Sequence, residues 1–217
     1  MTGLELIAFL LGGALVTIQV TILSAPVALA VAFALGLARL SRWCALRVIS
    51  NIIVEIFRGT SVLVQLFVIF FVLPAVLNVR LSSVPTAVIA LGLNFGAYAS
   101  EVVRSAIISV DRGQREAAAA LNMTPRLAML LVVLPQALRT MLPPFGNYGV
   151  QLFKATSITS LVQIHELTFR GYIAIHTTFE TVKILSLVAI IYFIMIFPAS
   201  RGVRWLERHM ERGSASR

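Results

Sequence analysis

The sequence has few of the residues on which soluble enzymes and metal proteins depend. Its 217 residues include one cysteine, Cys44, so no disulfide forms within the chain, and no CxxC or paired Cys/His spacing indicates a metal site. Only 12% of the residues are charged, whereas 59% are hydrophobic. Soluble globular domains are about 45 to 50% apolar. The composition therefore excludes an ordinary soluble globule.

Several catalytic and nucleotide-binding motifs are also absent. No Gly-x-x-x-x-Gly-Lys-Ser/Thr phosphate loop occurs, so the chain does not bind ATP in the P-loop manner. Without a Gly-x-Ser-x-Gly elbow or a His-Glu-x-x-His pair, an intramembrane hydrolase would lack its nucleophile or its metal. We therefore expect no enzymatic activity and no cofactor, and any ATP must be bound by another subunit.

Long apolar runs dominate what is present, and the mean hydropathy is +0.92. A transmembrane helix needs about 20 such residues. We predict an all-α membrane protein with a single transmembrane domain over 1–217 and five spans, at about 10–38, 51–77, 84–108, 141–163 and 182–200. An odd number of spans places the termini on opposite sides, and it does not divide into the equal inverted halves of many secondary transporters.

The positive charges orient this bundle. The net charge of +9 comes from cations at the ends of apolar runs and not from a basic, aromatic groove, so nucleic acid is not an expected partner. Arginines are concentrated in 39–47, 104–126 and 201–217, while the other side holds Arg80, Arg170 and Lys183. Since cytoplasmic loops carry the excess of Lys and Arg, we expect the N-terminus outside and the C-terminus in the cytoplasm.

A polar hairpin at about 110–130 interrupts the apolar runs and falls on the cytoplasmic side. Strong helix formers predict a short helix from Glu116 to Leu121. Asn122 tolerates the left-handed conformation that closes a helix, Thr124 is a suitable cap for the next one, and Pro125 suits its first turn. The alternative is an ordinary amphipathic surface helix.

The spacing of this hairpin resembles the EAA motif of bacterial ABC importer permeases. Glu116-Ala117-Ala118 is followed after three residues by a turn position, Asn122, and after nine more by Val132-Val133-Leu134-Pro135. The family usually has Gly at the turn, and Asn is the residue that best replaces it at positive φ. The resemblance implies a type I importer fold in which the hairpin, from Gly113 through Glu116, Asn122, Thr124 and Pro125, is a coupling helix that docks on an ATPase.

Other segments resemble permeases of the polar amino acid importer family. They are the segment from Glu55 to Phe67, the third span from Asn94 to Arg104, the stretch from Leu134 to Asn147, and Lys154-Ala155-Thr156-Ser157-Ile158. The sequence departs from that family at Ser61, where Pro is common, and at Ala155, where Asp is usual. The resemblance implies an ATPase dimer, an extracytoplasmic solute-binding protein and a second permease as partners. It implies as substrate a polar amino acid or a similar small zwitterion, such as an ectoine-like compatible solute.

Ionisable groups inside spans are costly and face the bundle interior or an aqueous path. We expect structural ion pairs between Glu55 and Arg58 and between Glu101 and Arg104, which are each three residues apart. Lys154 has no acid within a helical turn, so it either attracts a substrate carboxylate or pairs across the bundle with Glu101 or Glu55. As candidates for the translocation path we name Asn94, Tyr98, Gln151 and Lys154.

Two other functions remain open at this point. A channel or facilitator would move small polar solutes without ATP, and its hairpin would be only a loop. A structural membrane subunit would have no substrate path. The segment 164–181, with His165 and His176, is predicted on the outer surface, either as a contact for a binding protein or as an interfacial helix.

Overall fold

The protein is helical through nearly all of the residues that the structure describes. In this computed structural model these are 3–78 and 82–214, with the backbone alone for 209–214. Among them, four helices are long and apolar enough to cross a membrane: α1 (Gly3–Ala38), α5 (Ser83–Ser109), the run Pro125–Val162, and Thr181–Arg208 within α10 (Thr181–Ser214). The helix pair Cys44–Gly59 and Val62–Leu77, bent at a short break, makes a fifth if the pair is one span. The predicted all-α bundle is confirmed.

The second predicted span, 51–77, is not one straight helix. Helix α2 (Cys44–Gly59) ends at Thr60, and the chain turns by 105° before α3 (Val62–Phe67), a π-helical turn (Val68–Val72) and α4 (Leu73–Leu77). Thr60 is extended, and Ser61 caps α3 because its hydroxyl accepts a hydrogen bond from the Leu63 amide at 3.3 Å. The predicted range therefore contains a break, because the apolar run continues through Thr60 and Ser61 while the helix stops at Gly59.

The fourth span is longer than the predicted 141–163. It begins at α7 (Pro125–Ala128) and continues through a π-helical turn (Met129–Val133), α8 (Leu134–Ala155) and a 3₁₀ segment (Thr156–Val162). A proline has no N–H, and its ring crowds the carbonyl four residues back. Just before Pro135, the Leu134 amide donates to the Met129 carbonyl five residues back, so the helix widens at this point and continues.

Helices α1 and α5 pack closely through small residues. A side chain at Gly92 would lie 2.5 Å from Val27, and one at Gly96 would lie 2.6 Å from Val31, so neither position has room for a Cβ atom. These small residues on α5 therefore form a packing surface, as is common between membrane helices. This contact makes α5 the most enclosed of the spans.

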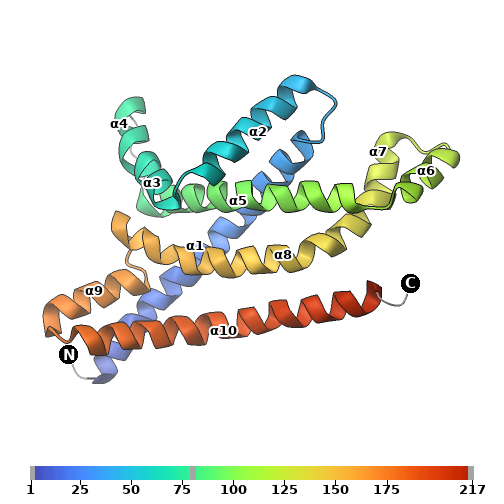
Figure 1. The fold of residues 1–217 in the computed structure, drawn as a ribbon. Helices are drawn as coiled ribbons and strands as arrows, with labels where there is room; N and C mark the ends of the chain where they lie inside the picture. Colours follow the sequence, from blue (N-terminus) through green and yellow to red (C-terminus); the bar gives the residue numbers. More distant parts are fainter. Residues whose placement is uncertain (1–2, 79–81, 215–217) are drawn as a thin grey trace.

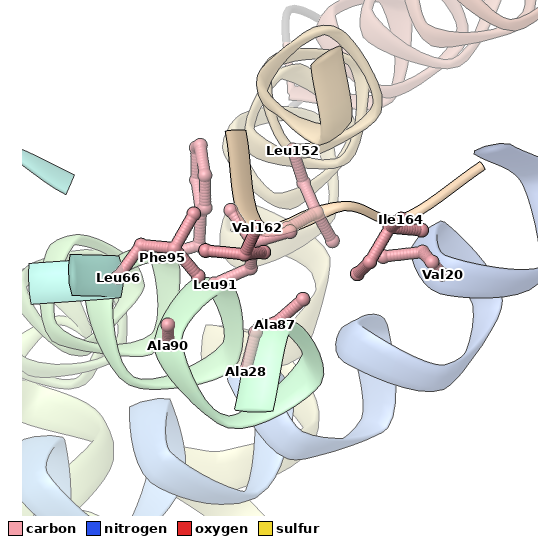
Figure 2. Close-up of a cluster of buried hydrophobic side chains, with 10 residues drawn as sticks. All are labelled: Val20, Ala28, Leu66, Ala87, Ala90, Leu91, Phe95, Leu152, Val162 and Ile164. Carbon is pink, nitrogen blue, oxygen red and sulfur yellow. The ribbon is translucent and has the colours of Figure 1, made fainter. Parts of the chain in front are cut away.

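The largest buried cluster joins these two helices to the later parts of the chain (Figure 2). Its members come from α1, α3, α5, α8 and the segment after α8: Val20, Ala28, Leu66, Ala87, Ala90, Leu91, Phe95, Leu152, Val162 and Ile164. Other large apolar side chains stay exposed, such as Phe193 at 64% on α10. An apolar surface of this kind faces lipid or a partner subunit.

The short helices of the hairpin and α9 lie at opposite ends of the bundle (Figure 1). Helix α6 (Arg112–Ala120), α7 and the end of α10 near the C-terminus lie at one end. The N-terminus and α9 (Leu167–Thr178) lie at the other. This arrangement places the hairpin at the same end of the bundle as the last turns of α10.

Candidate functional site

The hairpin begins with α6, which follows directly on the end of α5. The helix starts at Arg112, four residues before the predicted start, because Asp111 caps it: its carboxylate accepts a hydrogen bond from the Gly113 amide at 2.7 Å. Such a cap satisfies an N–H that has no partner inside the helix. One turn later Arg112 and Glu116 form an exposed ion pair at 3.0 Å.

Asn122 closes α6 in the predicted left-handed conformation, with φ of 54°. The backbone N–H of Asn122 donates to the Ala119 carbonyl at 2.9 Å, and the backbone N–H of Met123 donates to the Ala118 carbonyl at 3.1 Å. Bonds of this pattern satisfy the last carbonyls of a helix. The departure from Gly therefore preserves the turn.

Thr124 and Pro125 start the next helix as predicted. The Thr124 hydroxyl accepts from the Leu127 amide at 3.4 Å, and Pro125 occupies the first turn, where its missing N–H costs nothing. Because α7 runs on into α8, the hairpin is continuous with a membrane-spanning helix.

Contacts that the sequence did not predict fix α6 to both neighbouring spans. A guanidinium nitrogen of Arg115 donates to the Ile107 carbonyl near the end of α5, and the Gln136 amide on α8 donates to Gln114 Oε1 at 3.2 Å. Ala118 is 2% exposed and packs inward. These contacts attach α6 to both α5 and α8.

The outer side of α6 is open in this chain. Gly113, Glu116 and Ala117 are exposed, and Leu121 is 76% exposed. A rigid helix that presents small, charged and apolar side chains together is suited to contact another protein.

Two of the predicted path residues lie at the break after α2. The Asn94 amide donates to the Phe57 carbonyl at 3.2 Å and to Gln65 Oε1 at 3.0 Å. The Tyr98 hydroxyl donates to the Arg58 carbonyl at 3.0 Å. Since the last carbonyls of a helix lack partners within it, these side chains hold the broken end of α2.

The other two path residues, Gln151 and Lys154, are exposed on α8. The rings of Tyr98 and Tyr148, whose centroids are 6.3 Å apart, bring α5 and α8 together. Within the described chain, no hydrogen bond joins Asn94 or Tyr98 to Gln151 or Lys154. Lys154 lines an open cavity of about 620 Å³ between α8 and α10, together with Ser157 and Arg204.

Of the two alternatives for Lys154, pairing across the bundle does not occur within the described chain. Its ammonium forms no ion pair with Glu101 or Glu55. The cation is therefore left facing the cavity between α8 and α10.

Glu101 is the centre of an ion-pair cluster. Its carboxylate lies 2.6 Å from Arg39 Nη1, 2.7 Å from Arg104 Nη2 and 3.9 Å from Arg58 Nη1. The predicted pair with Arg104 is confirmed. The predicted pair of Glu55 with Arg58 is not formed in the part of the chain that the structure describes, because Arg58 turns toward Glu101 and lies over the ring of Tyr98, while Glu55 is exposed.

Sequence reasoning missed a buried carboxylate, Glu166, which the prediction placed on the outer surface. Its side chain is 0% exposed. It accepts hydrogen bonds from the Tyr192 hydroxyl at 2.7 Å, the Phe169 amide at 2.9 Å and the Thr17 hydroxyl at 3.4 Å. The only local signal was its position just before α9, where an acidic residue suits a helix cap.

The remaining part of 164–181 is fixed to the bundle. Arg170 on α9 donates to the Phe9 carbonyl of α1 at 2.8 Å. His165 and His176 are exposed, as predicted. Within the residues that the structure describes, no three His, Cys, Asp or Glu side chains gather as metal ligands would.

Comparison with known proteins identifies the family to which this chain belongs. The family model described as the binding-protein-dependent transport system inner membrane component matches residues 25–212. This chain belongs to that family. It is a multi-pass inner-membrane permease component of the ABC importer kind, as its motif and spans predicted.

Individual relatives agree with this membership. The L-cystine transport system permease TcyB of Bacillus subtilis is 40% identical over 202 residues, which cover 93% of this chain and 86% of TcyB. The glutamine transport system permease GlnP of Escherichia coli is 36% identical over 207 residues, 94% of each chain. A crystal structure of an amino acid ABC transporter with histidines superposes with a TM-score of 0.86 at 29% identity, covering 93% of this chain and 94% of that one.

Proposed function

We propose that this permease subunit imports an amino acid or a similar small zwitterion, and that α6 couples its spans to a separate ATPase dimer. The observation that carries the proposal is the hairpin itself, which is open on its outer side and fixed by Arg115 and Gln136 to two spans. Coupling requires an element whose position differs between two states and that moves others with it. Helix α6 is attached to two spans, α5 and α8, and its outer side is open to a partner.

The other partners follow from the same mechanism. A second permease, identical or paralogous, encloses the path, and an extracytoplasmic solute-binding protein delivers solute at the end of the bundle where α9 lies. The charge distribution supports this orientation, with the hairpin and C-terminus in the cytoplasm and the N-terminus outside.

The substrate proposal rests on the relatives and on Lys154. The named relatives belong to L-cystine and glutamine systems, and both solutes carry a carboxylate. Lys154 offers an unpaired cation in the described chain, and Gln151 is exposed on the same helix. Asn94 and Tyr98 would shape the path by holding the broken span. Because Ser61 and Ala155 depart from the family pattern, an ectoine-like compatible solute is retained beside the amino acids.

The test is reconstitution of the permease with its ATPase and binding protein in liposomes. We expect the ATPase to co-purify with the permease in detergent, and solute uptake to require ATP. Replacing Glu116 by Lys should weaken that association and leave membrane insertion unchanged, because Glu116 lies on the outer side of α6. Uptake by the permease alone without ATP would overturn the proposal in favour of a facilitator.

A further inference from the structure

A second polar site lies beside the hairpin, where the connection between α1 and α2 meets the start of α7. It is an open cavity of about 780 Å³. Its lining combines cationic, hydroxyl and apolar side chains: Arg42, Thr124, Pro125, Arg126, Met129 and Leu130. None of the coupling contacts described above uses its two arginines.

The charge of the cavity is unbalanced. Arg42 and Arg126 are both exposed, and in the described part of the chain neither forms an ion pair. No acidic side chain lines the cavity. The acids nearest to Arg126 along the chain are already engaged, since Asp111 caps α6 and Glu116 pairs with Arg112. The acid nearest to Arg42, Glu55, lies on α2 and does not line the cavity. Two unpaired cations that share one cavity attract an anion.

The rest of the cavity is apolar and continues onto the surface of a span. Met129 and Leu130 line it, and Leu130 and the neighbouring Leu131 are 59% and 63% exposed. Trp43, which follows Arg42, is 77% exposed. Tryptophan is enriched where the lipid headgroups meet water. The ligand that fits is therefore an anion with an apolar tail.

We propose that this cavity binds the headgroup of an anionic phospholipid, with the phosphate between Arg42 and Arg126 and an acyl chain along Met129 and Leu130. Its assignment to the cytoplasmic leaflet rests on the proposed orientation, whereas the binding itself does not. Thr124 and Pro125 line the cavity and also belong to the hairpin, where they form the start of α7. The bound lipid therefore stabilises the start of α7, which follows the turn at the end of α6.

The native tryptophans provide a direct assay. The chain has two, and the Trp205→Phe variant leaves Trp43 beside the cavity as the single reporter. The full-length permease is reconstituted in phosphatidylcholine vesicles that contain increasing fractions of brominated phosphatidylglycerol or, in parallel, brominated phosphatidylcholine. We expect quenching of Trp43 fluorescence by brominated phosphatidylglycerol to reach its midpoint at a lower mole fraction than quenching by brominated phosphatidylcholine. Arg42→Gln and Arg126→Gln should each raise that midpoint about five-fold.

The matched control is Arg47→Gln, which removes the same charge from the first turn of α2 without touching the cavity. Its midpoint should stay near that of the parent. Equal quenching by the two lipids, or an Arg47→Gln midpoint raised as much as the other two, would overturn the site. Quenching is measured on the permease alone, so its failure leaves ATP-dependent uptake unaffected, and failure of ATPase association leaves the quenching result unaffected.

Discussion

At the scale of single residues, the buried carboxylate Glu166 differs most from what the sequence alone indicated. It joins three elements, because Thr17 lies on α1, Phe169 on α9 and Tyr192 on α10. A buried carboxylate is tolerated only when its oxygens are hydrogen-bonded, and here both are. Glu166 therefore fixes α9 to two spans, α1 and α10.

We expect Glu166→Ala to destabilise the permease by about 1 to 3 kcal/mol, because the Tyr192 hydroxyl and the Phe169 amide lose their acceptor. Glu166→Gln should cost less, since its carbonyl oxygen still accepts from Phe169. Thermal unfolding in detergent measures both. The control is Glu180→Ala, which removes an exposed carboxylate paired with Lys183 at 2.6 Å, and equal melting temperatures for the two alanine variants would contradict the prediction.

The ion pairs show which contacts of single residues can be predicted from their spacing in the sequence. The pair of Glu101 with Arg104 could be predicted, because residues three apart meet on one helix. The contacts of Glu101 with Arg39 and Arg58 could not, because they depend on how α1 and α2 cross α5. Once those arginines are in place, Arg58 has a better partner than Glu55. The same limit applied to Glu166 and Tyr192, which are 26 residues apart.

At the scale of elements, the hairpin was predictable because its geometry is local. Asn122, Thr124 and Pro125 act on residues within one turn, so the sequence carries the information directly. Only the start of α6 differs from the prediction, because the Asp111 carboxylate caps the helix at Arg112. The fixation of α6 by Arg115 and Gln136 depends on α5 and α8 and was not predictable.

The turn makes a prediction about coupling. Asn122→Val places a β-branched residue at φ of 54°, which costs about 1 to 2 kcal/mol, whereas Asn122→Gly avoids the strain. We expect Val to weaken ATPase binding about 5- to 30-fold and Gly to change it little. Titration of the ATPase onto permease in nanodiscs measures the difference. Equal binding by the Val and Gly variants would mean that the turn geometry does not matter for docking.

The break in the second span was not predictable, because its partners lie on other helices. The Gln65 amide donates to the Phe57 carbonyl at 2.9 Å and to the Thr60 hydroxyl at 2.7 Å, and Asn94 supports it from α5. In a membrane an unsatisfied carbonyl costs several kcal/mol. The chain bends at this point because these side chains satisfy the carbonyls that the bend exposes.

Gln65→Leu should therefore destabilise the broken span by about 1 to 3 kcal/mol, because it leaves the Phe57 carbonyl with one donor fewer in a buried site. The matched control is Gln19→Leu, which replaces an exposed amide on α1 by the same apolar side chain. Thermal unfolding and ATP-driven uptake are compared for both variants. A Gln65→Leu protein as stable and active as Gln19→Leu would show that the break does not need this amide.

At the scale of the whole molecule, composition predicted the all-α membrane class and its long apolar helices, but not how they pack. Apolar length is a property of the sequence, whereas the close contact of α1 with α5 requires Gly92 and Gly96 to meet Val27 and Val31 on another helix. The exposed apolar side chains of α10 are equally a property of the assembly, because lipid or a second permease covers them. The orientation of the chain in the membrane can be tested by a single measurement.

The lone cysteine provides that measurement. Cys44 is exposed at the start of α2, directly after the connection to α1 and on the proposed cytoplasmic side. A membrane-impermeant thiol reagent should therefore label it in inverted vesicles and not in intact cells, because the reagent does not cross the bilayer. The control carries Cys44→Ser and Phe179→Cys, which moves the thiol to a position that is 86% exposed between α9 and α10. That variant should be labelled from outside, and labelling of the two proteins from the same side would contradict the topology on which the coupling mechanism depends.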